Sequence, residues 1–202
     1  MKINKYEDEL EWKQARLGKI TGSRLADVVV LRGTNEKKGF YQLIAERLAS
    51  PRPEGENAML RGHTLESEAV CVLENELGIT FNKELVIWER EDNSSIAISP
   101  DAYSEDLTEA VEVKCLNSAD HIKAVITNEY PDEYRFQVYQ YFIVNDDLKK
   151  LYFVMYDPSL SVKSFYKFVI NREDIYEEIG KYATYEVDML DRVNEIVNQL
   201  SF

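Results

Sequence analysis

The chain has 202 residues, of which 45% are apolar and 11% aromatic, so it can bury a core and is not a disordered protein. Its formal net charge of −13 speaks at first against a nucleic-acid partner. No apolar run reaches the ~18 residues of a membrane-spanning helix, and the first residues lack the apolar core of a signal peptide. We therefore expect a cytoplasmic protein without membrane contact.

The metal-ligand inventory is small. The sequence holds two cysteines, Cys71 and Cys115, and two histidines, His63 and His121. They cannot build a four-cysteine iron–sulfur cluster, nor a four-ligand zinc site without carboxylate help. A metal in this chain is therefore expected to be a hard ion on oxygen ligands, Mg²⁺ or Mn²⁺.

The charge is unevenly distributed along the sequence. Residues 12–53 contain nine Lys and Arg against three Asp and Glu, whereas residues 171–202 contain three against eight. An acidic chain can thus present one basic face to a phosphate backbone. Ordinary charge on helix surfaces gives the same pattern.

The N-terminal elements begin with a short helix predicted over 6–15. Residues 16–24 hold two glycines and read as a loop that ends at Ser23, the expected N-cap of a helix over 25–31. The glycines are flanked by three basic side chains: Arg16, Lys19 and Arg24. This composition is typical of an anion pocket, and also of a simple turn with a helix cap.

Two amphipathic helices follow, over 38–49 and over 57–77, with Gly78 as the expected C-cap of the second. Glu66 lies one residue beyond the apolar Leu65, so it faces either solvent or the edge of the core.

The remainder of the chain alternates strands and helices. Strands are predicted at 84–88, 95–99, 110–116, 151–156 and 162–170. Helices are predicted at 118–128, from after Pro131 to 144, and at 172–200. The last two strands read as a hairpin, and the polar side of the last helix is strongly acidic. Gln137, Gln140 and Tyr141 are predicted to share one face of the second helix. The order predicts an α/β (α+β) fold with a central mixed sheet flanked by helices.

The stretch from 99 to 116 carries the strongest chemical signal. Asp101 follows a proline, and alternation in the next strand places Glu112 and Lys114 on one face, with Val111 and Val113 on the other. Two carboxylates and an ammonium at a strand pair can hold a divalent metal and orient a water. A half-buried strand with a solvated charged face fits the same residues.

Six short motifs in order resemble the lambda-type phage exonucleases, the YqaJ viral recombinase family of the PD-(D/E)xK nuclease superfamily. The motifs are Trp12 with 16–23, 61–66, Ser99-Pro100-Asp101, Glu112-Val113-Lys114-Cys115, 137–140 and Tyr156-Asp157-Pro158. Ala102 stands where the family usually has glycine, and Leu116 where it has proline. Neither departure removes a catalytic group. The resemblance implies a restriction-endonuclease-like core.

The resemblance also implies residue roles. Asp101, Glu112 and the Val113 carbonyl would ligate one Mg²⁺, or Mn²⁺ as its substitute, and Glu66 would help to hold a second ion. Lys114 would orient the attacking water, with Gln137 positioning the lysine or the water. The residues that match the DNA-contacting positions are Arg16, Ser23 and Ser99 for a 5′-phosphate, and Arg32 for the duplex.

By this resemblance the chain is a Mg²⁺-dependent 5′→3′ exonuclease of double-stranded DNA ends, leaving a 3′ strand for phage or prophage recombination in the bacterial cytoplasm. A ring-shaped homotrimer and a single-strand annealing protein are the implied partners. We expect one nuclease domain, 1–202, comprising an end-binding part (12–53), a catalytic core (57–158) and a C-terminal helix (172–200). A restriction-like endonuclease and a non-catalytic DNA-binding module are the alternatives.

Overall fold

The computed structural model describes residues 1–31, 36–48 and 59–201. Its strands are β1 (Lys2–Lys5), β2 (Val86–Glu89), β3 (Ala97–Ile98), β4 (Ala102–Tyr103), β5 (Glu109–Lys114), β6 (Lys150–Tyr156) and β7 (Phe165–Asn171). Its helices are α1 (Glu9–Ala15), α2 (Gly22–Val28), α3 (Lys38–Leu48), α4 (Met59–Leu77), α5 (Ser118–Thr127), α6 (Arg135–Val144) and α7 (Tyr176–Leu200). The 3-10 turns η1 (Asp132–Tyr134) and η2 (Arg172–Ile175) lead into α6 and α7.

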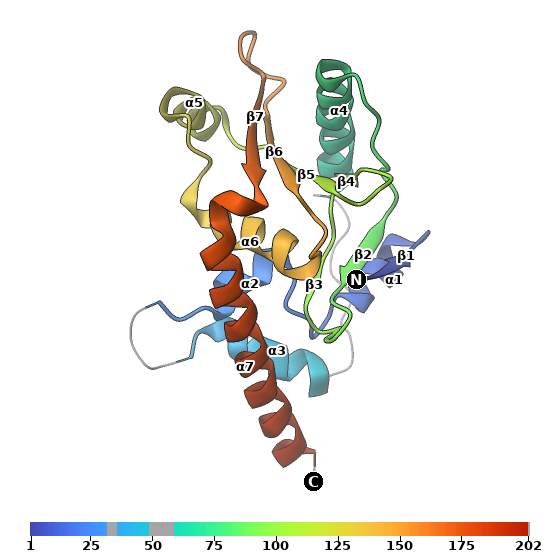
Figure 1. The fold of residues 1–202 in the computed structure, drawn as a ribbon, viewed down its shortest axis with the longest axis vertical. Helices are drawn as coiled ribbons and strands as arrows, with labels where there is room; N and C mark the ends of the chain where they lie inside the picture. The colour runs from blue at the N-terminus through green and yellow to red at the C-terminus, as the bar shows by residue number, and fades with distance from the viewer. Residues whose placement is uncertain (32–35, 49–58, 202) are drawn as a thin grey trace.

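A four-stranded sheet of order β4-β5-β6-β7 forms the centre of the upper part of the molecule (Figure 1). β5 and β6 run parallel and the outer pairs run antiparallel, so the predicted mixed sheet and the final hairpin are both confirmed. The parallel pair requires a crossover connection, which α5, η1 and α6 provide. A mixed sheet flanked by helices is the α/β fold that the sequence predicts.

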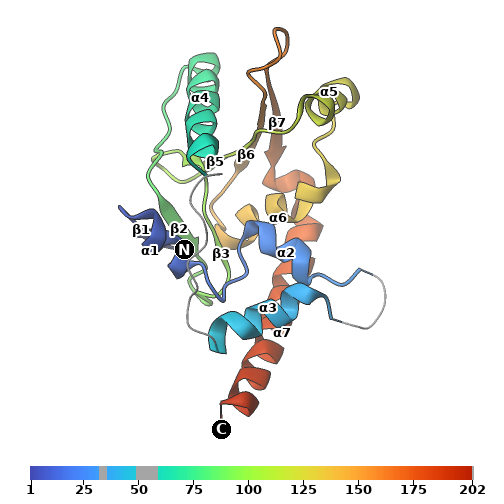
Figure 2. The same cartoon turned by 180° about the vertical axis from the view of Figure 1, so that it is seen from behind.

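Helices cover both faces of this sheet. α4 packs on β5 and β6 on one face, and α6 packs on β6 on the other (Figures 1 and 2). Val111 and Val113 join the apolar cluster under α4, whereas Ala110 belongs to the cluster on the α6 side. The predicted alternation of β5 is therefore confirmed, and Glu112 is directed toward α6.

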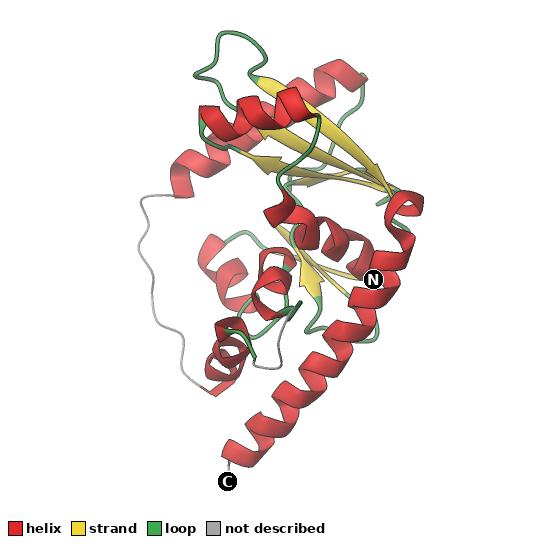
Figure 3. Ribbon diagram, turned by 90° about the vertical axis from the view of Figure 1, so that its left-hand side faces the viewer, coloured by secondary structure: helices red, strands yellow, loops and turns green. Residues whose placement is uncertain are grey.

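Below the main sheet, α2 and α3 pack against α6 and α7, and the second sheet, β1-β2-β3, lies beside them (Figure 3). α7 descends past α6 and α3 to the C-terminus. Its buried stripe includes Ile179, Tyr182, Met189 and Val193, as the helical period predicts, and also one acid, Glu186. No helix in the described part of the chain combines the length and apolar character needed to cross a bilayer.

Three local predictions need correction. β1 and β4 were not predicted. A four-residue polar strand and a two-residue strand show too little alternation of apolar and polar residues to be recognised from the sequence. Ser23 is not an N-cap: α2 already begins at Gly22 after Thr21, whose carbonyl accepts the first helical hydrogen bonds. α2 also ends at Val28 rather than 31.

Gly22 explains why the helix can start there. A Cβ at this position would lie 2.3 Å from Ile98 Cδ1 and 2.9 Å from Gln137 Cγ. The first turn of α2 therefore touches both β3 and α6, a close approach that only glycine allows. This contact brings the N-terminal segment against the catalytic-motif residues.

Candidate active site

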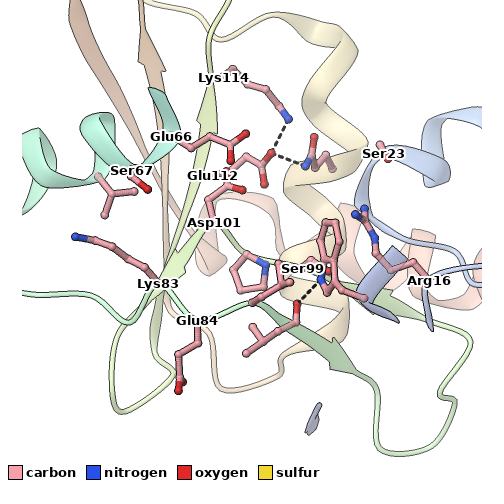
Figure 4. Close-up of a pocket in the computed structure, with 16 residues that line it drawn as sticks. Arg16, Ser23, Glu66, Ser67, Lys83, Glu84, Ser99, Asp101, Glu112 and Lys114 are labelled. Atoms are coloured by element: carbon pink, nitrogen blue, oxygen red, sulfur yellow. Dashed lines mark hydrogen bonds and ion pairs between the residues drawn. The ribbon is translucent and has the colours of Figure 1, made fainter. Parts of the chain in front are cut away.

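A cavity of about 250 Å³ opens where β5, α4, α6 and the N-terminal loop meet (Figure 4). It is lined by all of the described residues that the sequence singles out as site side chains: Arg16, Ser23, Glu66, Ser99, Asp101, Glu112, Lys114 and Gln137. Arg32 lies outside the described residues. Trp12, Ser67, Lys83 and Glu84 also line the cavity, and the sequence motifs gave no site role to them.

Glu112 lies at the centre of this arrangement and is only 3% exposed. Its Oε1 accepts hydrogen bonds from Lys114 Nζ at 2.5 Å and Gln137 Nε2 at 2.6 Å. Its Oε2 accepts a short hydrogen bond from the buried Tyr141 hydroxyl. A strand with a solvated charged face is thereby excluded, because the carboxylate is buried and fully partnered.

Lys114 and Tyr141 both feel the charge of Glu112. Burial alone would lower the pKa of the Lys114 ammonium, but the charge and hydrogen bond of Glu112 raise it overall. Burial and the neighbouring carboxylates raise the pKa of Tyr141 well above its usual value. Lys114 is therefore charged and Tyr141 is a hydrogen-bond donor throughout the physiological pH range.

Asp101 lies beside Glu112 because strand β4 is so short. β4 pairs only with Ala110 and Val111, which leaves the next edge group of β5, the Val113 N–H, free to donate to Asp101 Oδ2 at 2.6 Å. Burial, followed by the charges of Glu112 and Glu66, raises the pKa of Asp101 well above its usual value. The charges of two neighbouring carboxylates thus act on Asp101 in this cavity.

Glu66 comes from α4, on the opposite side of β5 from α6. Figure 4 shows its carboxylate directed toward Asp101 and Glu112. Glu66 is half-buried and lines the cavity. Its charge helps to raise the pKa of Asp101. Of the two orientations left open by the sequence, the structure therefore selects the one toward the core edge.

The other end of the cavity carries one cationic and two hydroxyl side chains, a chemistry that suits an anion. The Arg16 guanidinium stacks on Trp12, with 4.2 Å from its carbon to the ring centroid, and burial lowers its pKa against the opposing effect of Glu112 and Asp101. Ser99 Oγ is buried and has no hydrogen-bond partner among the described residues. Ser23 is exposed in the first turn of α2 and completes this end (Figure 4).

Lys19 and Arg24, the two remaining basic residues of the N-terminal loop, do not line this end of the cavity. Lys19 pairs with Glu89 at 3.0 Å, and Arg24 donates to both oxygens of Glu46. Their acidic partners lie far away in the sequence, so the loop alone could not show that these cations are already neutralised.

The prediction of one shared face for the α6 glutamines was partly wrong. Gln137 and Tyr141, four residues apart, converge on Glu112. Gln140 is instead fully buried and donates to the Ile20 carbonyl at 3.2 Å, on the side of α6 away from the cavity. At 100° per residue an i, i+4 pair diverges by only about 40°, whereas i+3 falls about 60° to the other side.

Comparison with known protein families identifies the family to which the sequence belongs. The sequence model of the YqaJ-like viral recombinase domain matches residues 11–147, which is more than half of the chain. The chain belongs to this family. No protein among the curated sequences matches it significantly.

Among solved structures, the YqaJ-like chain is similar to LHK-Exo, an alkaline exonuclease from Laribacter hongkongensis. The LHK-Exo complex with dAMP has a TM-score of 0.78 and 26% identity, covering 95% of this chain and 98% of that one. A second LHK-Exo crystal structure has a TM-score of 0.77 with the same identity and coverage. A phage-related exonuclease from Haemophilus somnus 129PT shares the fold, with a TM-score of 0.57 and 15% identity over 88% of this chain and 95% of that one. Family and likeness together support a DNA nuclease.

The donor set suits a hard divalent cation, although Glu112 is turned toward protein donors. Among the described residues, no three His, Cys, Asp or Glu side chains are placed to hold a metal ion together. One oxygen of Glu112 already accepts hydrogen bonds from the Lys114 ammonium and the Gln137 amide. Carboxylates of Asp101, Glu112 and Glu66 around one cavity are the ligand type that Mg²⁺ and Mn²⁺ prefer.

Asp101→Asn is expected to stabilise the metal-free protein at neutral and alkaline pH. The unfolded chain ionises Asp101 near 3.8, whereas the folded chain resists ionisation, so stability falls as pH rises from that value through the raised folded-state pKa. Asparagine removes the charge and can still accept the Val113 N–H. Each kcal/mol recovered raises Tm by about 2–4 °C in a chain of this size.

Thermal unfolding of wild type and Asp101→Asn in EDTA measures this effect from about pH 4 to about pH 9. The difference in Tm should grow with pH and vanish at the acidic end. A wild-type protein that is the more stable of the two at about pH 8 would contradict the crowding of charge in the cavity.

Proposed function

We propose that this YqaJ-family chain is a Mg²⁺-dependent 5′→3′ exonuclease that digests double-stranded DNA from a 5′-phosphorylated end. The observation that carries the proposal is the convergence of Asp101, Glu112, Lys114 and Gln137 on one cavity, with an arginine and two serines at its other end. Its relative LHK-Exo has been solved with dAMP, a deoxynucleoside monophosphate. Stepwise digestion of a DNA strand releases products of this kind.

Asp101 and Glu112 would hold the cation, with the Val113 carbonyl as a third oxygen and Glu66 beside a second ion. The N–H and C=O of one strand residue point to the same edge, so the Val113 carbonyl faces Asp101, to which its N–H donates. A bound cation of this kind neutralises charge on the phosphate and makes a water more acidic. Such a cation would also offset the charges of Glu112 and Glu66, which together with burial raise the pKa of Asp101.

Lys114 would have two roles, one without a bound cation and one with it. Without a cation it neutralises Glu112 directly, at 2.5 Å. If that carboxylate held a cation instead, the Lys114 ammonium would be free to orient the attacking water, and its charge would favour the hydroxide form of that water. Gln137, which donates to the same Glu112 oxygen, would position that water or the lysine. Positioning and charge stabilisation supply most of the acceleration in phosphoryl transfer.

The Arg16 end of the cavity would bind the terminal 5′-phosphate. Arginine presents a planar fork of donors that matches phosphate, and stacking on Trp12 fixes the plane of that fork. The buried Ser99 hydroxyl adds a group that needs a partner, and Ser23 adds another hydroxyl. Because Ser99 lies two residues before Asp101, a phosphate bound here lies close to the carboxylates.

The wider biological setting follows from the family alone. We propose a role in phage or prophage recombination in the bacterial cytoplasm, a homotrimeric ring around DNA and a single-strand annealing protein as partner. Residues 12–53 would serve DNA-end binding within a single nuclease domain. The acidic polar side of α7 is compatible with an outward position away from DNA.

Lys114→Met and Asp101→Asn should each reduce digestion of linear duplex DNA by at least about 10³-fold, because each removes a group that acts on the reacting phosphate or water. Both variants should remain folded. Mg²⁺-dependent release of acid-soluble nucleotides measures the loss, with EDTA as the metal control. Covalently closed circular DNA should stay intact with wild type, whereas its cleavage would indicate an endonuclease. Robust digestion by either variant would refute the assigned roles.

Arg16→Gln should slow digestion of 5′-phosphorylated ends far more than that of 5′-hydroxyl ends, by about 10- to 100-fold, because only the former carry the dianion that the fork binds. Linear duplexes labelled at either strand end, with and without the phosphate, also report polarity. Lys19→Gln is the matched control, since Lys19 is paired with Glu89 outside the cavity. Equal slowing on both kinds of end would refute the phosphate pocket.

A further inference from the structure

A second polar cluster lies behind the cavity, where α6 meets α7 (Figure 1). Glu186 on α7 and Gln140 on α6 are both 0% exposed. The Gln140 amide nitrogen donates to the carbonyls of Ile20 at 3.2 Å and Ala97 at 3.4 Å, and lies 3.4 Å from Glu186 Oε2. One side chain thus joins four segments of the chain.

Three of these segments, all but α7, lead to the candidate active site. Ile20 is followed by the start of α2 and Ser23, and Ala97 by Ser99 and Asp101. α6 itself presents Gln137 and Tyr141 to Glu112 from its other side. A displacement of Gln140 would therefore shift the segments that carry the proposed metal ligands, the water-positioning residues and the phosphate-binding residues together.

This cluster contains one hydrogen-bond donor too few for its acceptors. Gln140 Oε1 and Glu186 Oε1 are both buried acceptors without a partner among the described residues. Turning the amide over would not help, because its oxygen would then face the two backbone carbonyls. An ionised Glu186 would leave a buried negative charge with a single long hydrogen bond, an arrangement that is strongly unfavourable.

We infer that Glu186 is a neutral carboxylic acid whose O–H donates to the Gln140 amide oxygen, and that it is a positioning residue for the catalytic helix α6. The added proton supplies the missing donor, and the two side chains then exchange two hydrogen bonds in a ring. Glu186 in this way fixes the amide that ties α6 to Ile20 and Ala97. Its effect on catalysis rests on the nuclease function proposed above, whereas its protonation does not.

The surroundings agree with a neutral acid. Burial raises the pKa of Glu186 well above its usual value, against smaller opposing effects of the Gln140 hydrogen bond and of Arg90. Among the described residues packed around it, Arg90 is the charged group whose field reaches Glu186, and that guanidinium is already bound to Asp92 at 2.6 and 2.9 Å. Among the residues that the structure describes, no cation forms an ion pair with Glu186.

Glu186→Gln is the decisive variant, because it is permanently neutral and keeps an N–H donor for the Gln140 oxygen. Tm is measured for wild type and variant in EDTA from about pH 4 to about pH 9. A raised folded-state pKa means that stability is lost as pH rises from 4.5, the usual value, through the folded value. The Tm of Glu186→Gln should therefore increase relative to that of wild type as pH rises over that range. A difference that stays constant above about pH 5.5 would overturn the inference, since it would show an ordinary carboxylate.

Asp188→Asn is the matched control, because it removes the same charge from an exposed position two residues along α7. Its Tm should follow that of wild type at every pH. A growing gap for this control as well would also overturn the inference, because it would assign the effect to the charge of the helix.

The positioning role is tested by Glu186→Ala and its comparison with Glu186→Gln on linear duplex. Alanine should lower kcat by about 10- to 100-fold with KM little changed, and glutamine should restore it to within about twofold of wild type. Equal loss in both variants, or no loss in either, would overturn this role. If wild type itself digests no DNA, the proposed function fails, while the pH dependence of Tm still decides the state of Glu186.

Discussion

The structure depends on how one buried carboxylate, Glu112, is satisfied. It lies on a central strand with 3% exposure, and a lysine, an amide and a phenol donate to its two oxygens. An unpaired charge in this position would be strongly destabilising, so these partners must be fixed before any ligand binds. The strand, the crossover helix α6 and the short β4 edge are all arranged around this requirement.

The same requirement links stability to function. Lys114 neutralises Glu112, but burial and the charges of Glu112 and Glu66 still act on Asp101, and they raise its pKa well above the usual value. Like charges gathered in one cavity store unfavourable energy that a divalent cation can relieve. Destabilisation of the metal-free protein and the proposed affinity for a divalent cation would then be two consequences of one arrangement, which fits the tendency of perturbed acids to mark functional sites.

The parts of the site that depend on local periodicity could be predicted from the sequence. Two-residue alternation placed Glu112 and Lys114 on one face of β5, and the Pro100–Asp101 turn placed the second acid beside them. What could not be predicted depends on partners distant in sequence: Lys19 and Arg24 are neutralised by Glu89 and Glu46. Glu186 could not be told from the other acids of α7, because a buried acid in a helix differs from a solvated one only through its tertiary neighbours.

The most direct test of the account is a Mg²⁺ titration followed by thermal unfolding of wild type and Glu112→Gln. A ligand that binds only the folded state raises Tm with concentration, so wild type should gain stability continuously as Mg²⁺ rises above its Kd. Glu112→Gln keeps the size of the side chain but loses the carboxylate, and its Tm should not respond. An equal rise of Tm in both proteins would show that Mg²⁺ binds elsewhere and would contradict the central claim.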